Sequence, residues 1–272
     1  MKKFLAFSLL VVMLFAASAS AETIVGRHSL LNATEQQMLD AMKDSADGRF
    51  YVGVDVDSIT LKFYDSLVAL QLALDKGDVD LITVPLCVGQ YMLNTNHNYV
   101  LKGLDWWFVS QSNSFNFAFM EARKDLQERF NKALAQMKRT GALGMLEHQY
   151  VTDPTQESLK PVEFNKFEDA ETITVAVTGD MPPLDYIAEN GTPAGYNTAL
   201  LAAIGRIMNV NIRLINIDTL ARAAALQSGR ADVVFWFQSS VDPSAPNLDV
   251  PEGIILSDPY FKWNEQYFIG KK

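Results

Sequence analysis

The chain has 272 residues, a length that suits two domains of ordinary size, and a formal net charge of −9 at pH 7. An acidic surface argues against partners such as nucleic acids and anionic membranes, although a binding cleft can differ from the surface. The single cysteine, Cys87, excludes an internal disulfide, and its apolar surroundings favour a buried, inert thiol.

Residues 1–21 have the pattern of an export signal. Lys2 and Lys3 give a basic start, residues 4–17 form an apolar run, and residues 19–21 form an A-x-A cleavage site. The apolar run is shorter than the roughly 18–20 residues that a membrane-spanning helix needs. No cysteine lies near the cleavage site, so lipid attachment there is not available. We therefore expect a periplasmic protein without a lipid anchor, and no membrane insertion after cleavage.

Short strands alternate with helices before residue 151. The segment 124–139 is the clearest helix, because its apolar residues share one stripe, its other face is charged, and Gly141 follows it. The sequence predicts further helices at 34–43, 65–76 and 89–94, a helical turn or two near 143–150, and strands at 24–26, 51–56, 59–63, 79–84 and 115–120.

Residues 152–171 predict a linker, because they contain two prolines and many acids and show no clear period. After the linker, the alternation of strands and helices resumes, which favours a largely parallel sheet in each of two α/β lobes. The predicted elements are strands at 173–177, 210–215 and 232–237, a turn at 178–183, and helices at 198–208 and 218–228.

Two stretches of the chain, residues 65–84 and 218–236, echo each other. Each begins with an Asp or a Ser/Thr cap, continues as an apolar helix, stops at a glycine and leads through an aspartate into a strand. We interpret the four aspartates as structural caps and strand starts: Asp65, Asp80, Asp218 and Asp232. The echo indicates two similar lobes, and such a pair usually binds a ligand between them.

Residues 174–186 (TVAVTGDMPPLDY) and 189–197 (ENGTPAGYN) resemble the opening of the family 3 extracellular solute-binding proteins, the amino-acid-type receptors of ABC importers. The resemblance continues through residues 226–232 and 257–260. The earlier part of the chain resembles the other end of the same family. Residues 66–80 are similar to the end of the family's second lobe, and residues 117–146 are similar to the C-terminal helices that return to its first lobe.

The resemblance implies a two-lobed periplasmic-binding-protein fold in a circularly permuted order; two fused, truncated copies are the alternative. A linker of about 20 residues reaches up to about 65 Å when extended, so it can join termini on one lobe, whereas two half-copies would leave open sheet edges and incomplete cores. The expected division is a signal peptide at 1–21, the family's second lobe at 22–114, a return strand and helices packed on the first lobe at 115–151, the linker at 152–171, and the first lobe at 172–272.

The resemblance implies a ligand between the lobes, at the ends of the strands, as is general for open α/β sheets. In the family, the position of Ser239 places a hydroxyl on the ligand carboxylate. Two candidates keep a structural alternative: Trp236 as core at a strand end, and Arg27 as a solvated surface residue. The candidates are Asp180, Tyr186, Trp236, Phe237, Gln238, Ser239 and Ser240 on the first lobe, and Arg27, His28, Ser29, Thr83 and Pro85 on the second.

Two departures from the family's pattern concern the ligand. The amino-acid receptors carry an arginine soon after the Ser/Thr hydroxyl, which grips the α-carboxylate through two hydrogen bonds; residues 241–247 contain no arginine. Pro85 stands where the family has an acid for the α-amino group. We therefore expect weak or no binding of standard α-amino acids, and the aromatic candidates favour a ligand with a flat or apolar part.

The leading hypothesis is a monomeric periplasmic protein that captures a small polar or partly aromatic solute by hinge closure and passes it to an ABC permease. The alternatives are a ligand-sensing receptor subunit for a membrane signalling protein and a dehydratase-like enzyme. The sequence predicts no catalytic arrangement, no cofactor and no metal site, because His28, His97 and His148 lack the spacing of metal ligands. We further expect a single covalent crossing between the lobes, near 106–115, with Trp106 and Trp107 packed at the hinge.

Overall fold

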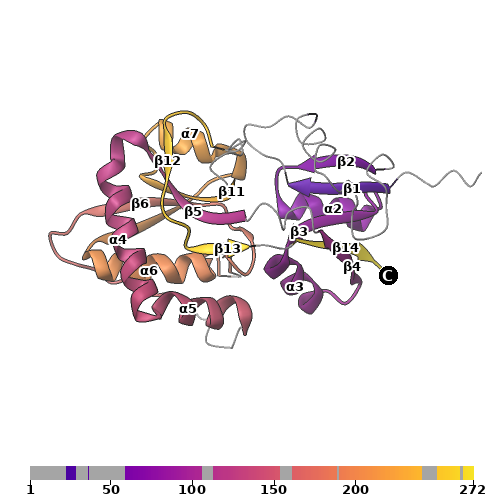
Figure 1. Cartoon of the computed structure of the whole chain (residues 1–272), viewed down its shortest axis with the longest axis horizontal. Helices are drawn as coiled ribbons and strands as arrows, with labels where there is room; N and C mark the ends of the chain where they lie inside the picture. The colour runs from indigo at the N-terminus through magenta and orange to yellow at the C-terminus, as the bar shows by residue number, and fades with distance from the viewer. Residues whose placement is uncertain are drawn as a thin grey trace, which may run out of the picture.

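The computed structural model describes residues 23–28, 36, 59–105, 113–153, 161–188, 190–240, 250–263 and 266–272. These residues form two α/β lobes, each built around one sheet (Figure 1). The two-lobed α/β fold predicted from the sequence is thereby confirmed. The signal segment, Ser29, the strand at 51–56 and the Trp106–Trp107 pair lie outside the described residues, as does the helix at 34–43 apart from Gln36, which is helical.

The small lobe contains a five-stranded sheet with the order β2-β1-β3-β14-β4. Strand β1 runs parallel to both β2 and β3, whereas β14 runs antiparallel to β3 and β4. The elements are β1 (Thr23–His28), β2 (Ile59–Tyr64), α2 (Leu67–Lys76), β3 (Leu81–Pro85), α3 (Leu86–Thr95), β4 (Tyr99–Asp105) and β14 (Gln266–Lys271).

The large lobe contains a six-stranded sheet with the order β10-β6-β11-β5-β12, and β13 pairs with β5 beside this path. A separate three-stranded sheet follows β6. The strands are β5 (Asn113–Met120), β6 (Thr172–Val177), β7 (Asp180–Met181), β8 (Asp185–Ile187), β9 (Pro193–Ala194), β10 (Asn211–Asn216), β11 (Val233–Ser240), β12 (Ile254–Leu256) and β13 (Phe261–Trp263).

The two sheets share one plan. In each, a first strand (β1 or β6) lies between two parallel neighbours, and an antiparallel strand (β14 or β5) separates the third strand from the last. The echo in the sequence corresponds to this plan, because α2 and β3 hold the same places as α7 (Arg222–Gln227) and β11. The repeat therefore reflects two equivalent helix–strand units.

The chain passes between the lobes twice, from β4 to β5 and from β13 to β14. The expected single crossing is therefore wrong, and the expected lobe at 172–272 loses its last strand to the small lobe. The physical reason is that β14 fills the place between β3 and β4, where it hydrogen-bonds to both. Phe268 and Ile269 of β14 are fully buried there.

The two ends of the described chain lie on the same side of the small lobe, where β1 begins and β14 ends. Strand β1 is parallel to β3 and β14 is antiparallel to it, so β1 begins where β14 ends. Figure 1 shows the start of β1 and the C-terminus on the side of the small lobe that faces away from the large lobe.

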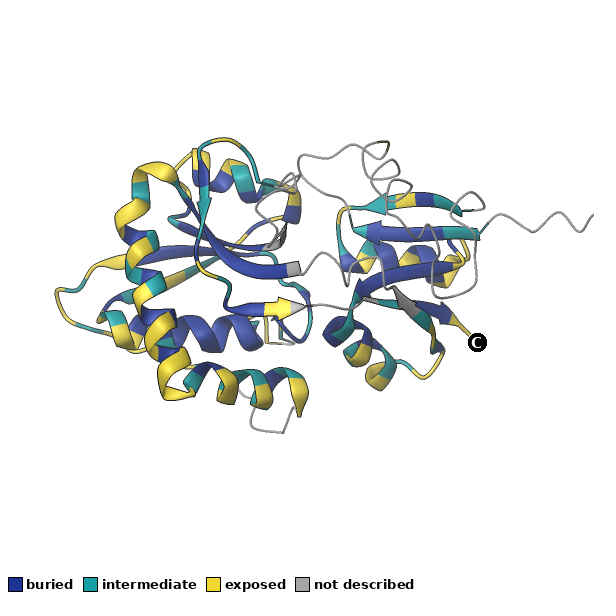
Figure 2. Cartoon of the chain, in the orientation of Figure 1, coloured by how far each residue is buried: buried dark blue, intermediate teal, exposed yellow. Residues whose placement is uncertain are grey.

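Helix α4 (Lys124–Thr140) packs on the large lobe with the stripe predicted from its sequence, and Gly141 ends it in the left-handed region at φ 76°. Its neighbours are β5, α6 (Tyr196–Met208) and α5 (Ala142–Glu147), which continues as a π-helical turn over His148–Thr152. Figure 2 shows α6 buried along most of its length, while α4 and α5 expose their outer faces. The buried stripe of α4 is Leu126, Phe130, Ala133, Leu134 and Met137.

The described part of the predicted linker is packed rather than loose. Val162 and Phe164 contact the hydrophobic core of the large lobe. The backbone of Phe167 exchanges two hydrogen bonds of 2.9 Å with the side chain of Asn211 at the start of β10. The described segment 161–171 thus lies against the large lobe before β6.

Candidate functional site

The first strands of the two sheets end opposite each other. His28 is the last residue of β1, and Asp180 follows β6 after a two-residue turn. Their side chains meet across the lobes, with His28 Nε2 at 3.8 Å from Asp180 Oδ2. Thr219 Oγ1 donates a hydrogen bond of 2.6 Å to the same oxygen of Asp180. Two residues predicted for the ligand site are therefore brought together, and they form an ion pair whenever His28 is protonated.

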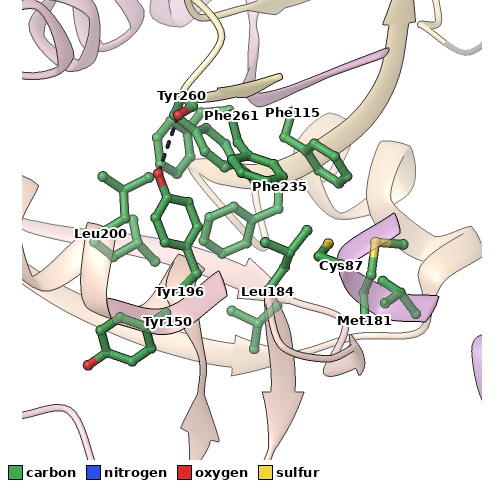
Figure 3. Close-up of a cluster of buried hydrophobic side chains, with 14 of the residues drawn as sticks. Cys87, Phe115, Tyr150, Met181, Leu184, Tyr196, Leu200, Phe235, Tyr260 and Phe261 are labelled. Atoms are coloured by element: carbon green, nitrogen blue, oxygen red, sulfur yellow. Dashed lines mark hydrogen bonds between the residues drawn. The ribbon is translucent and has the colours of Figure 1, made fainter. Parts of the chain in front are cut away.

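An apolar contact between the lobes lies close to this pair. Cys87 of α3 belongs to the same buried cluster as Met181 and Leu184 of the large lobe, and Figure 3 places its thiol beside them. Burial raises the pKa of the Cys87 thiol far above its ordinary value, which suppresses the reactive thiolate. The prediction of a buried thiol is confirmed.

Tyr186 lies at the rim of the same contact. It pairs with Asp180 in the small β7–β8 ladder and is half-buried. Burial raises the pKa of its hydroxyl, and the nearby hydroxyls of Tyr91, on α3, and Tyr150 raise it further. A residue predicted for the large-lobe wall thus faces a helix of the small lobe.

The remaining candidates divide by burial. Arg27 and Thr83 are buried within β1 and β3, so the alternative of a solvated surface arginine at position 27 is wrong. Pro85 ends β3 and directly precedes α3. Trp236 on β11 is fully buried. The candidates that follow it on the same strand are Phe237, Gln238, Ser239 and Ser240, whose side chains lie outside the described part of the structure.

A pocket lies within the large lobe behind the Asp180 turn. It is small and leaves about 20 Å³ for the centres of water-sized groups. Four apolar side chains line it: Phe115, Met181, Leu184 and Phe235. Its polar lining comprises Thr178, Asp185, Asn197, Arg222, Trp236 and Tyr260.

Asp185 supports the turn that carries Asp180. Its Oδ2 accepts hydrogen bonds from Thr178 N at 3.0 Å, Thr178 Oγ1 at 3.2 Å and Gly179 N at 3.2 Å. Burial raises the pKa of the Asp185 carboxyl to about 6, and these hydrogen bonds from Gly179 and Thr178 limit the rise. The carboxyl therefore titrates closer to neutrality than an exposed aspartate.

Arg222 also lines the pocket and is only 1% exposed. The centre of its guanidinium lies 4.6 Å from the ring centroid of Trp236, a cation–π arrangement. Its Nε donates a hydrogen bond of 3.0 Å to the carbonyl of Thr219, the residue whose hydroxyl reaches Asp180. Asp185 and Arg222 are thus both linked, through hydrogen bonds, to the region of Asp180 at the contact between the lobes.

The sequence reasoning missed Asp185, Asn197 and Arg222. A signal was present in each case: a polar residue stands where the local pattern calls for an apolar one. Arg222 lies on the same face of α7 as the buried Ala225 and Leu226, and Asn197 lies at the start of the apolar helix α6. A polar side chain on a core face must find a polar partner or a polar pocket.

Two general features bear on the class of site. No group of three or more His, Cys, Asp or Glu side chains within the described ranges is arranged to hold a metal ion. None of the described helices combines the length and the apolar character needed to cross a bilayer.

Residues 173–245 match the family model of the bacterial extracellular solute-binding proteins, family 3. The comparison with curated proteins gave no match. Among solved structures, the chain is similar to an ABC transporter periplasmic binding protein from Brucella ovis with glutathione bound, at 13% identity over 93% of this chain and 63% of that chain, with a TM-score of 0.46. The chain thus spans less than two thirds of that protein's length.

Two further structures are similar. One is a putative L-cystine ABC transporter from Listeria monocytogenes, at 12% identity over 92% of this chain and 82% of that chain, with a TM-score of 0.42. The other is the GluR0 ligand-binding core from Nostoc punctiforme in complex with L-glutamate, at 12% identity over 91% and 83%, with a TM-score of 0.37. At these identities, the neighbours do not identify a ligand for this chain. The segment 173–245, which runs from β6 through β11, is therefore the part of the chain that is similar to family 3 of the bacterial extracellular solute-binding proteins.

Proposed function

We propose that the protein captures a small solute between its two lobes by hinge closure and delivers it to an ABC permease, acting as a monomer in the periplasm. The contact between His28 and Asp180 carries this proposal, because it joins the carboxyl ends of the first strands of two equivalent sheets. In open α/β sheets ligands bind at this edge. Closure over a ligand would hold these two residues together, and opening would separate them.

The residues at the contact favour one class of solute. Met181, Leu184 and Tyr186 of the large lobe face α3 of the small lobe, so the rim is largely apolar. The absence of an arginine at 241–247 and the presence of Pro85 remove the charge pairs that would hold an α-amino acid. We therefore propose a small solute with polar groups and a flat or apolar part, rather than a standard α-amino acid.

The permuted chain order is part of the same proposal. In the permuted order, the helices after β5 complete the large lobe, and the two ends of the chain meet on the small lobe. The packing of α4 and α5 on α6 supports the first point, and the shared edge of β1 and β14 supports the second. The packed segment at 161–167 supports a direct connection from α5 to β6.

A thermal-shift screen of a metabolite library, followed by calorimetry, tests the proposed function. A hit should lose affinity by about tenfold or more in His28→Ala, because the closed state loses its contact with Asp180. His97→Ala is the matched control, since His97 is exposed on the loop after α3. Small-angle scattering should report a more compact form with the solute. Binding without compaction and with an unchanged affinity in His28→Ala would contradict the mechanism.

A further inference from the structure

We propose that the pocket inside the large lobe is a subsite for an uncharged carboxamide or urea-like group, held by Asp185, Asn197 and Trp236. The inference rests on the proposed function, because the group would be one end of the captured solute. Thr178 and Met181 line the pocket and lie at the carboxyl end of β6, and Met181 also packs in the cluster with Cys87 at the contact between the lobes. A solute between the lobes can therefore reach the pocket beside Met181.

Four buried polar atoms on the pocket wall, outside Arg222, have no hydrogen-bond partner among the residues that the structure describes. They are Asp185 Oδ1, Asn197 Oδ1, Trp236 Nε1 and the Tyr260 hydroxyl. The four residues are 2%, 3%, 0% and 2% exposed. Buried polar atoms are normally paired, and leaving them unpaired is unfavourable. The pocket therefore presents two acceptors, one donor and one hydroxyl, which can donate or accept, to a polar group.

The donor and acceptor pattern selects the chemistry of the group. An amide NH₂ can donate to the two oxygens, and an amide carbonyl can accept from the indole N–H. A carboxylate has no hydrogen to donate to either oxygen. An ammonium group cannot accept from Trp236. A carboxamide carries both the donor hydrogens and the acceptor oxygen that these atoms can use.

The charges of the pocket point to the same class. Asp185 and Arg222 lie on the same lining and have opposite signs when both are ionised. A ligand group with a full charge would add an uncompensated charge to a buried site, which is costly. A neutral, dipolar group leaves the charge balance between Asp185 and Arg222 unchanged.

Hydrogen bonds also connect the pocket to the turn of Asp180, which meets His28 at the contact between the lobes. Asp185 holds Thr178 and Gly179, the two residues before Asp180. Arg222 holds the carbonyl of Thr219, whose hydroxyl holds Asp180. A group bound to Asp185 would therefore act on the turn that meets His28, so occupation of the pocket and closure of the lobes would favour each other.

The indole N–H signals of the four tryptophans, observed by ¹⁵N NMR, test the subsite in the intact protein. Trp236→Phe assigns the Trp236 signal. The probes are acetamide, acetate and isopropylammonium, three small molecules of similar size that differ in charge. We expect acetamide to shift the Trp236 signal saturably, and the two ions to bind at least about tenfold more weakly, because each would bury an unbalanced charge. Equal shifts with all three probes, or no shift with acetamide, would overturn the subsite.

A pair of variants gives an independent measurement. Asn197→Leu removes one acceptor at similar volume and should weaken acetamide binding by at least about fivefold, because one hydrogen bond of the group is lost. Asn94→Leu, on the exposed side of α3, should leave it unchanged. If Asn197→Leu does not fold, the comparison of the three probes on the unmodified protein still decides. If acetamide does not shift the Trp236 signal while a library solute still makes the protein more compact, the proposed subsite is wrong and the proposed function stands.

Discussion

The small and large lobes join their first and third strands with the same pair of hydrogen bonds. In the small lobe, Asp80 Oδ2 accepts from Ile24 N at 2.8 Å, and Asp80 N donates to Ile24 O at 2.8 Å. In the large lobe, Asp232 Oδ2 accepts from Thr174 N at 2.9 Å, and Asp232 N donates to Thr174 O at 2.8 Å. The equivalence extends from strand order to individual atoms.

The two lobes differ in what else contacts this pair of hydrogen bonds, which we call the strand clamp. Arg123, in the turn before α4, donates to the second oxygen of Asp232 at 2.7 Å and also approaches Glu171 at 3.5 Å. The large lobe thus ties its clamp to the helix that follows β5, the strand delivered by the crossing from the small lobe. The same local unit becomes more strongly anchored when a distant segment packs on it.

The largest expected effect tests that anchoring through the core. Phe130 of α4 is fully buried, with its ring 5.0 Å from that of Phe117 and 5.2 Å from that of Phe119. Phe130→Ala should lower the free energy of unfolding by about 3–5 kcal/mol. Urea denaturation followed by circular dichroism measures this loss. Hydrogen exchange should show the faster opening mainly in the large lobe, and equal opening in both lobes would show that they unfold as one unit.

A second prediction concerns Asp185, whose raised pKa is a feature of the large lobe. Its folded pKa of about 6 exceeds the ordinary value of 3.8, so the folded state binds the proton more tightly than the unfolded state. The stabilisation from protonation is present below about pH 4 and is lost as the pH rises to about 6, an effect of up to about 2–3 kcal/mol.

Asp185→Asn should remove this dependence, since the amide does not titrate and its oxygen can still accept from Thr178 and Gly179. The measurement is the urea midpoint of both proteins at intervals between pH 4 and pH 7. A difference between the two proteins that stays constant over this range would mean that Asp185 titrates normally. Asp180, the neighbouring carboxyl that contributes to the rise, can be replaced as a further control.

The third prediction compares the two clamps directly. Asp232→Asn should cost about 1–2 kcal/mol, because it weakens charge-assisted hydrogen bonds to Thr174 and Arg123 that are partly exposed. Asp80→Asn should cost about half as much, since Asp80 is exposed and holds only the strand clamp. Thermal unfolding of both variants gives the ranking. A larger loss in Asp80→Asn would reverse the comparison.

The smallest effect belongs to an exposed ion pair of the large lobe. Arg129 Nη1 lies 2.7 Å from Glu171 Oε2, and both side chains are more than a third exposed. Exposed pairs contribute about 0–1 kcal/mol, so Arg129→Ala should change stability by no more than about 0.5 kcal/mol. The same unfolding experiment, repeated at high salt, should reduce the difference further.

Local patterns predicted most of the helices and the central strands, whereas the strands β4, β12 and β13 were not predicted. The stripe of α4 and its glycine stop were predicted because helix periodicity is written in neighbouring residues. The place of β14 was not predicted, because pairing with β3 depends on residues far apart in the chain.

The candidate site divides in the same way. His28 and Asp180 were predicted because strand ends are visible in the sequence and meet at one edge. The pocket of Asp185, Asn197 and Arg222 was missed, because three separate segments supply these residues and no local pattern links them.

The position of β14 has a consequence for the newly made chain. Strands β3 and β4 are neighbours only through β14, so the small sheet stays split until residues 266–271 have left the ribosome. A folded small lobe therefore cannot form early in synthesis, even though its other strands are made first.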